Sequence, residues 1–425
     1  MTSSKKFFTA LGLITLAVFF QGCGNALSLL SGQNTLQSPT NGVSLAAVTG
    51  PNVMSLTVNG ANCAAGSYAN KPCVSVTICA SGDTSNCQTV NDILLDTGSY
   101  GLRVFKSAMN TTLSNALALS PVQISSNTVA ECVAFGDGTS DWGPVENATL
   151  LLGTEPAINV PIHVIDSTFT GQAAKCSGAD ANPTAAGFNG ILGVGLLVQD
   201  CPDCVSSPSN GMYFACGGST CTGSDVPLAK QVTNPIALIP ADPTNSGKAD
   251  NNGVIIMLPL INLGGVADAD GYVVFGIGTR SNNTPSAVNT YTADTNNRIT
   301  TNFTNQSGIE SFLDTGSNGL FFPEGTSGLV TCSSETWYCP GSTVSLTATN
   351  ISHTGLLSGT IPFSIGNTNA LDSTANSVFI ELGANSTVGG SSVFDWGLPF
   401  FLGRNVYVGF SGKTSTLGTG PYWSY

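Results

Sequence analysis

The five-residue sequence Leu-Asp-Thr-Gly-Ser occurs twice, at residues 95–99 and 313–317, once in each half of the chain. An apolar run precedes each aspartate, which predicts a buried strand that delivers an acid to a tight glycine turn. Two such turns can bring Asp96 and Asp314 together. Because two carboxyl groups in one site do not both ionise readily, one keeps a proton, and the pair offers a general acid and a general base at once.

Length and composition favour a two-domain β protein. A chain of 425 residues is too long for one core and suits two domains of ordinary size. Only 9% of residues are charged and 50 are glycine, which is typical of an all-β protein with many polar turns. The formal net charge is −13 and no basic stripe is present, so we expect no nucleic-acid partner.

The first residues resemble a bacterial lipoprotein signal. Lys5 and Lys6 precede an apolar run at 7–20 that is too short to favour a membrane span, and Gln-Gly-Cys follows, ending at Cys23. The resemblance implies that cleavage before Cys23 leaves its thiol carrying a lipid anchor. An ordinary secretory signal with an incidental cysteine is the alternative.

We therefore expect a signal peptide at 1–22, a flexible tether at 23–42, an N-terminal lobe at 43–234 and a C-terminal lobe at 235–425. Each lobe contains one Asp-Thr-Gly-Ser copy. The expected location is the bacterial cell envelope, facing the periplasm or the cell exterior, with the lipid anchor as the only contact with a membrane.

Cysteine usage agrees with export. Twelve cysteines remain beside Cys23, an even number compatible with six disulfides in an oxidising compartment. Cys332 and Cys339 bracket a short loop and form the most clearly favoured pair. Cys201 and Cys204 have the spacing of a redox or zinc motif, but their Pro/Ser-rich surroundings favour a structural disulfide.

Further motifs repeat between the halves. Residues 188–195 (Phe-Asn-Gly-Ile-Leu-Gly-Val-Gly) and 399–403 (Pro-Phe-Phe-Leu-Gly) follow the two aspartates at similar distances. We expect each to be a strand whose glycine lets it pass close to the loop that carries an aspartate. Between the first aspartate and its glycine segment, residues 134–139 predict a β-hairpin tip that would fold over a cleft.

Together with the strand at 272–276 and the closing segment at 398–410, these motifs resemble the pepsin-like aspartic proteases. The resemblance implies a bilobal acid-protease fold, with two pseudo-symmetric β-barrel-like lobes and a cleft between them. It makes Asp96 and Asp314 the catalytic dyad. The residues that it implies for support of the dyad are Thr97, Gly98, Ser99, Thr315, Gly316 and Ser317. The residues that it implies for the flap are Phe135, Gly136, Asp137 and Gly138.

The resemblance also implies specific contacts and a mechanism. Thr97 and Thr315 would form hydrogen bonds across the two lobes, and Ser99 and Ser317 would each donate to the neighbouring carboxylate. A water held between the aspartates would hydrolyse a peptide bond without a covalent intermediate, a metal or another cofactor. The expected partner is a peptide or protein substrate, and the expected state is a monomer.

Some residues depart from the family pattern. Phe135 stands where the family has a flap tyrosine, and Arg103 stands where it has the partner tryptophan. Trp142 could then cover the site instead, and Arg103 could lower the pKa of Asp96 or point to solvent. We interpret His163 and His353 as structural or surface residues.

These departures leave two other classes of function open. One is a non-catalytic, pepsin-fold binding protein of the cell envelope, since fold alone does not fix function. The other is a structural or adhesive surface lipoprotein. Retention of both aspartates favours the aspartic endopeptidase, a hydrolase.

Overall fold

The computed structural model describes residues 42–136, 138–325, 327–333, 336–386 and 393–425. The predictions for the signal peptide, most of the tether, lipidation at Cys23 and the flap residue Asp137 therefore lie outside the described residues. Among the residues described, strands dominate and helices are short, which confirms the prediction of an all-β protein.

Most of the strands belong to one large sheet. It contains β1 (Val43–Ser44), β2 (Val53–Val58), β3 (Pro72–Ala80), β4 (Cys87–Asp96), β5 (Tyr100–Phe105), β6 (Gln123–Ile124), β7 (Asn127–Ala134), β8 (Ser140–Leu151), β9 (Ile158–Ile165), β10 (Gly190–Val194), β11 (Tyr213–Gly217), β12 (Thr220–Gly223), β13 (Gly253–Met257), β14 (Ala269–Phe275), β15 (Thr290–Thr292), β23 (Asn405–Gly409) and β26 (Tyr422–Ser424).

A second sheet contains β16 (Ile299–Phe303), β17 (Gln306–Leu313), β18 (Leu320–Phe322), β19 (Val344–Ile351), β20 (Ser358–Ile365), β21 (Gly383–Asn385) and β22 (Val393–Trp396), and β24 (Thr414–Ser415) pairs with β25 (Gly418–Thr419). The α-helices are α3 (Thr111–Ala118), α4 (Pro183–Ala186), α5 (Thr368–Asp372) and α6 (Leu398–Phe401). The 3-10 turns are η1 (Lys106–Ala108), η2 (Ala174–Cys176), η3 (Pro202–Val205), η4 (Leu228–Lys230), η5 (Pro235–Leu238), η6 (Pro243–Asn245) and η7 (Ser281–Asn283).

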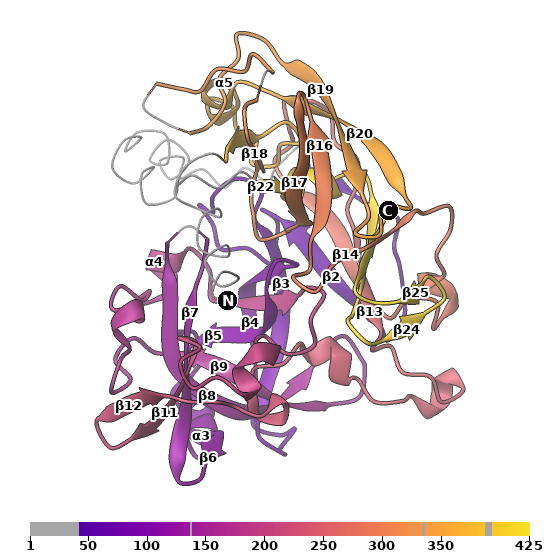
Figure 1. The fold of residues 1–425 in the computed structure, drawn as a ribbon. Coiled ribbons are helices and arrows are strands. Elements are labelled where there is room, and N and C mark those ends of the chain that lie inside the picture. The colour runs from indigo at the N-terminus through magenta and orange to yellow at the C-terminus, as the bar shows by residue number, and fades with distance from the viewer. Residues whose placement is uncertain (1–41, 137, 326, 334–335, 387–392) are drawn as a thin grey trace.

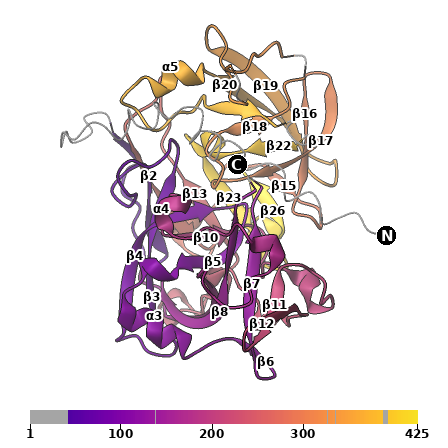
Figure 2. The ribbon, with the colours of Figure 1, turned by 90° about the vertical axis from the view of Figure 1, so that its left-hand side faces the viewer.

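The large sheet draws strands from both halves of the sequence. Strands β3 to β12 lie towards one end of the molecule and β16 to β22 towards the other, with β2, β13 and β14 between them (Figures 1 and 2). In this middle region β14 pairs with β2 and β13, and β13 pairs in turn with β23. The predicted lobes at 43–234 and 235–425 therefore share a continuous hydrogen-bonded sheet.

The same three-strand unit surrounds each Asp-Thr-Gly-Ser turn. In the first, β10 runs parallel to β4 and antiparallel to β5, and Gly193 lies opposite Asp96. In the second, β22 runs parallel to β17 and antiparallel to β18, and Trp396 lies opposite Leu313. Each turn therefore begins at the equivalent position, at the end of the strand that runs parallel to the middle strand of its unit.

The predicted strand at 399–403 is wrong, because most of this segment forms helix α6. The strand that passes beside the second turn is β22, and the glycine that permits the close approach is Gly397. A Cβ atom at Gly397 would lie 2.0 Å from the carbonyl oxygen of Gly319. Pro399 lies in the first turn of α6, where a missing N–H costs no helical hydrogen bond.

An aromatic cluster fills the core behind the second turn. Phe394 and Trp396 are two residues apart on β22, so they share one face of the sheet. Their ring centroids lie 4.3 Å apart. The rings that pack against this pair belong to Phe303, Phe322, Phe363 and Phe400.

All twelve cysteines of the described residues form disulfides, which confirms the prediction of six bridges. The pairs are Cys63–Cys73, Cys79–Cys87, Cys132–Cys176, Cys201–Cys204, Cys216–Cys221 and Cys332–Cys339. The favoured pair Cys332–Cys339 is confirmed, and Cys201 and Cys204 are bonded to each other. Most of these bridges close short loops and so constrain local segments.

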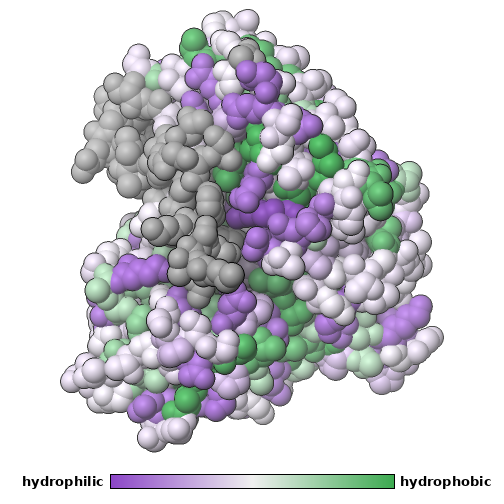
Figure 3. Space-filling model, in the orientation of Figure 1, coloured by the Kyte–Doolittle hydropathy of each residue, from purple (hydrophilic) through white to green (hydrophobic). Residues whose placement is uncertain are grey.

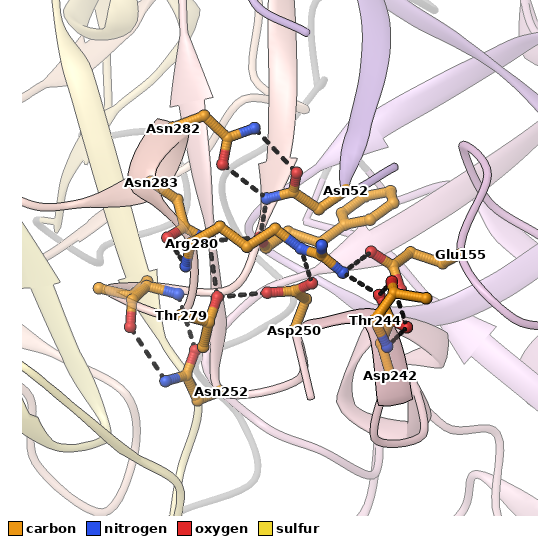
Figure 4. Close-up of polar contacts among 12 residues, drawn as sticks. Asn52, Glu155, Asp242, Thr244, Asp250, Asn252, Thr279, Arg280, Asn282 and Asn283 are labelled. Atoms are coloured by element: carbon orange, nitrogen blue, oxygen red, sulfur yellow. Dashed lines mark hydrogen bonds and ion pairs between the residues drawn. The ribbon is translucent and has the colours of Figure 1, made fainter. Parts of the chain in front are cut away.

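Arg280 joins three acids from two distant segments (Figure 4). Its guanidinium lies 2.8 Å from Asp242, 2.5 Å from Asp250 and 3.3 Å from Glu155. Asp242 and Asp250 belong to the segment between η5 and β13, and Glu155 lies between β8 and β9. Hydrogen bonds from Arg280 and Thr244 lower the pKa of Asp242 to about 2. Burial, together with the neighbouring Asp250, raises the pKa of Glu155 to about 7.

The surface mixes polar and apolar residues. On the face shown in Figure 3, hydrophobic residues form separate patches among hydrophilic ones. Within the described residues, no helix has both the length and the apolar character needed to cross a bilayer.

We expect Arg280→Met to lower the midpoint of thermal unfolding at pH 7 by several degrees, because three acids would then face one another without a cation. The pKa of Asp242 is depressed, so its contribution to stability is present above the ordinary aspartate range and is lost as the pH falls towards 2. The deficit should therefore shrink at pH 3. Circular dichroism melts at both pH values measure this deficit. Lys248→Met is the charge-matched control, at an exposed lysine of the segment that contains Asp242 and Asp250. Equal melting of the two variants at pH 7 would contradict the role of Arg280.

Candidate functional site

Two equivalent turns carry the predicted dyad. Asp96 is the last residue of β4, and Asp314 directly follows β17. The backbone N–H of Gly98 donates to Asp96 Oδ1 at 2.7 Å, and the N–H of Gly316 donates to Asp314 Oδ1 at 2.8 Å. Each carboxyl is thereby fixed by the turn that follows it.

The structure brings the two aspartates together. A Cβ atom at Gly98 would lie 2.7 Å from Asp314 Cγ, and one at Gly316 would lie 2.8 Å from Asp96 Oδ1. Each glycine therefore lies against the aspartate of the opposite turn. No larger residue fits at either position without displacing a carboxyl group, which explains why both copies have glycine after threonine.

Four hydrogen bonds join the turns through their threonines. Thr97 N–H donates to Thr315 Oγ1 at 3.0 Å, and Thr315 N–H donates to Thr97 Oγ1 at 2.9 Å. Each hydroxyl also donates to the opposite strand, Thr97 to the carbonyl of Leu313 at 2.9 Å and Thr315 to that of Leu95 at 2.7 Å. These are the contacts across the turns that the resemblance implied.

The surroundings of Asp314 perturb its ionisation. Loss of solvent raises the pKa of Asp314 well above its ordinary value, and the charges of Asp96 and Asp395 and a hydrogen bond with Asp96 raise it further. The Ser317 hydroxyl opposes this shift by donating to Asp314 Oδ2 at 3.0 Å. Burial and the neighbouring acids therefore favour the protonated form of Asp314.

The predicted role of Ser99 is wrong in this structure. Its buried hydroxyl has no hydrogen-bond partner among the described residues, so it does not donate to a carboxylate. The Ser99 carbonyl accepts from the N–H of Gly195 at 3.0 Å, which ties its backbone to the end of β10. Of the two serines, Ser317 alone donates to its aspartate as expected.

Arg103 does not point to solvent, which was one of its two predicted arrangements. The side chain is buried, and its guanidinium donates to Glu131 at 2.8 Å and to Asp200 at 2.9 Å. It also donates to the carbonyl oxygen of Tyr100 at 2.6 Å. Since Glu131 belongs to β7, this network attaches the strand that enters the predicted flap to the segment that follows the first turn.

The predicted hairpin is present. Strands β7 and β8 pair antiparallel, and the N–H of Phe135 donates to the carbonyl of Thr139 at 3.0 Å across the tip. Phe135 packs on the apolar cluster that includes Leu94 and Phe188. The flap glycines Gly136 and Gly138 lie at the tip, and Gly138 has a φ of +87° that favours glycine.

Trp142 does not take the place of a flap residue. It is fully buried beneath the hairpin, where its indole N–H donates to the carbonyl of Phe169 and its ring packs on Phe214. The expectation that it covers the site is therefore wrong. It lies opposite Cys132 in the ladder, two residues from the last pair of the hairpin, Ala134 and Ser140.

Other polar groups surround the turns, and sequence reasoning missed two of them, Asn70 and Asp395. Asn70 donates to the carbonyl of Asn318 at 2.8 Å, and Asn318 donates to that of Ala69 at 3.3 Å, which ties the second turn to the segment before β3. The hydroxyl of Tyr100 accepts from Asn297 at 3.1 Å, and burial raises the pKa of this tyrosine. Asp395 is fully buried on β22. The signal for Asp395 was available, because an acid interrupts the apolar run Val-Phe-Asp-Trp.

The histidines have the structural or surface positions that we expected. His163 is fully buried, with its Nδ1 3.5 Å from Glu131, and burial lowers its pKa to about 4. His353 is exposed. Within the described part of the chain, one group of potential metal ligands lies close together, Cys63, Cys73 and Asp92. Its two sulfur atoms form a disulfide, and Asp92 pairs with Lys71, so this group does not fit a metal ion.

The fold and site define an all-β protein in which a duplicated strand unit holds two aspartates side by side. A family model described as "Protein of unknown function (DUF3443)" matches residues 48–425, and the chain belongs to this family. No curated protein matches the chain.

We expect Thr97→Val and Thr315→Val each to lower the free energy of unfolding by about 2 kcal/mol, because each leaves a buried N–H of the opposite turn without an acceptor. The double variant should lose less than the sum, since the two residues belong to one network. Denaturant unfolding of the four forms measures both effects. Thr233→Val is the matched control, a buried threonine whose hydroxyl donates only to Gln231, two residues away. Additive losses would contradict the coupling.

Proposed function

We propose that this protein is an aspartic endopeptidase with the bilobal fold of the pepsin-like proteases. The observation that supports this proposal most strongly is the meeting of Asp96 and Asp314 on two equivalent turns, each fixed by its own glycine N–H. The reciprocal threonine contacts support it further, because they hold the two carboxyl groups in a fixed relation. Such preorganisation is what proton transfer to and from a bound water requires.

In the proposed mechanism a water bound between the carboxyl groups attacks the scissile carbonyl carbon. Asp96 accepts a proton from this water, and Asp314 donates its proton to the carbonyl oxygen, which gives a neutral tetrahedral diol. As the C–N bond breaks, the proton on Asp96 passes to the leaving nitrogen, and a hydroxyl proton returns to Asp314. The raised pKa of Asp314 supports its role as the acid. The substrate is a peptide or protein, and the enzyme acts as a monomer.

The proposed location is the bacterial cell envelope, with a lipid anchor on Cys23. Six disulfides support an oxidising compartment outside the cytoplasm. The chain would face the periplasm or the cell exterior, joined to the membrane by the tether.

A second candidate is a binding protein that uses the same fold without cleaving its ligand. Two observations favour it. Phe135 packs where a flap tyrosine is expected, and the Ser99 hydroxyl has no hydrogen-bond partner within the described part of the chain. Both remove polar groups that would order the substrate and the acids. Against it, a binding protein has no need for two acids in one site, since burial makes them costly.

We expect the purified protein to cleave an unfolded peptide library between pH 3 and 7, and Asp96→Asn and Asp314→Asn each to reduce the rate by 10³-fold or more, as roughly expected for loss of an acid or base. Mass spectrometry of the products measures cleavage and reports specificity. Asp225→Asn, at an exposed aspartate, is the control and should keep full activity.

The outcome separates the two candidates. Cleavage that survives both substitutions would come from another site or a contaminant and would contradict the dyad. A folded wild-type protein that cleaves nothing at any of these pH values would favour the binding protein, and peptides retained by it would then identify its ligand.

We expect the wild-type chain expressed in a bacterial host to incorporate labelled palmitate and to enter the detergent phase, and Cys23→Ser to do neither. The control replaces two other cysteines, Cys201→Ser with Cys204→Ser. It should keep the label, because these two residues form a disulfide with each other. Label retained after Cys23→Ser would refute the anchor.

A further inference from the structure

A third aspartate lies beside the dyad. Asp395 is the third residue of β22, the strand that passes between β17 and β18. It pairs with Phe312 on β17 and with Phe321 on β18, so apolar residues stand on both sides of it in the ladder. The side chain is fully buried, and neither carboxyl oxygen has a hydrogen-bond partner among the described residues.

The alternation of the strands directs this carboxyl towards the site. Phe394 and Trp396 face the aromatic core, so Asp395 between them faces the opposite side of the sheet. Phe312, its partner on β17, shares that side, and so does Asp314, two residues further on. The guanidinium of Arg298 lies over the Phe312 ring on this side, 4.0 Å from its centroid.

Four side chains interact electrostatically with Asp395, namely Asp96, Asp314, Ser317 and Arg298. Burial raises the pKa of Asp395 well above the ordinary value, the charge of Asp96 raises it further, and the Ser317 hydroxyl and the charge of Arg298 oppose the shift. The charge of Asp395 in turn raises the pKa of Asp314. Arg298 does not belong to Asp395 alone, because it also interacts with Tyr100, Glu310 and Asp294.

We propose that Asp395 is a third acid of the site, a positioning residue whose charge determines the highest pH at which Asp314 still holds its proton. This inference rests on the proposed peptidase function. A buried carboxyl group between apolar neighbours is costly, and an apolar residue would complete this ladder at less cost. A role in retaining the proton of the pair accounts for its position.

The sign of the effect follows from the charges. Ionisation of Asp395 and ionisation of Asp314 oppose each other, so the proton of Asp314 survives to higher pH when Asp395 ionises first. Asp395→Asn removes this charge and keeps the shape of the side chain. The alkaline limb of the activity profile should therefore move to lower pH, by roughly one unit.

The test compares wild type, Asp395→Asn and Asp395→Leu for cleavage of one peptide from pH 3 to 8. Glu310→Gln is the matched control, since exposed Glu310 also acts on Arg298 but lies outside the group of three acids. Both Asp395 variants should lose the alkaline part of the profile and keep most of the activity at pH 3 to 4, and the control should follow wild type. An unchanged alkaline limb in a folded variant overturns the proposal.

Two measurements do not depend on activity. Because the pKa of Asp395 is raised in the folded state, its burial costs stability as the pH rises above the ordinary range near 4. The midpoint of thermal unfolding of Asp395→Asn should therefore rise relative to that of wild type as the pH increases from 4 to 7. Carbon-13 titration of labelled aspartates, assigned with Asp314→Asn, should show Asp314 ionising at lower pH in Asp395→Asn. A wild type without activity refutes the peptidase, whereas an unmoved Asp314 titration refutes the third acid.

Discussion

The reciprocal bonding of Thr97 and Thr315 is the interaction on which the site depends. Each threonine uses its backbone N–H and its hydroxyl to contact the opposite turn or the strand before it, so the N–H of each threonine depends on the other turn for its acceptor. The buried N–H groups would be left unpaired if the turns separated, at a cost larger than the net gain of an ordinary hydrogen bond. The two carboxyl groups therefore stay together because the backbones beneath them do.

The strand units explain how one short motif can serve twice. In each unit a central strand runs parallel to the strand that ends at the aspartate. A glycine at the end of this central strand lets another backbone segment pass close by. The first unit uses Gly193, and the second uses Gly397. Beyond this shared frame the surroundings differ, because Arg103 and its two carboxylate partners occupy the first side and the aromatic cluster of Trp396 occupies the second.

The sequence was most informative where a residue type has one geometric use. The duplicated Asp-Thr-Gly-Ser, the hairpin near Gly138 and the even number of cysteines each predicted a local structure that is present. Contacts that depend on distant partners were harder to predict. Arg103 has its partners on β7 and beyond β10, and Asp395 is meaningful only because strand pairing sets it beside Phe312. The strand predicted at 399–403 was wrong for the same reason. The sequence suggested Gly403 as the glycine of close approach, whereas strand pairing gives that role to Gly397, directly after β22.

The shared sheet has a consequence for how the chain reaches its native state. Strand β2 lies near the start of the described residues, and its neighbour β14 connects through β13 to β23, which in turn pairs with β26. The middle of the molecule is therefore incomplete until residues 405–424 have been synthesised. Such long-range pairing slows the completion of this part of the sheet. A chain shortened before residue 405 would lack β23 and β26, and of the described strands β13 would keep only β14 as a paired strand.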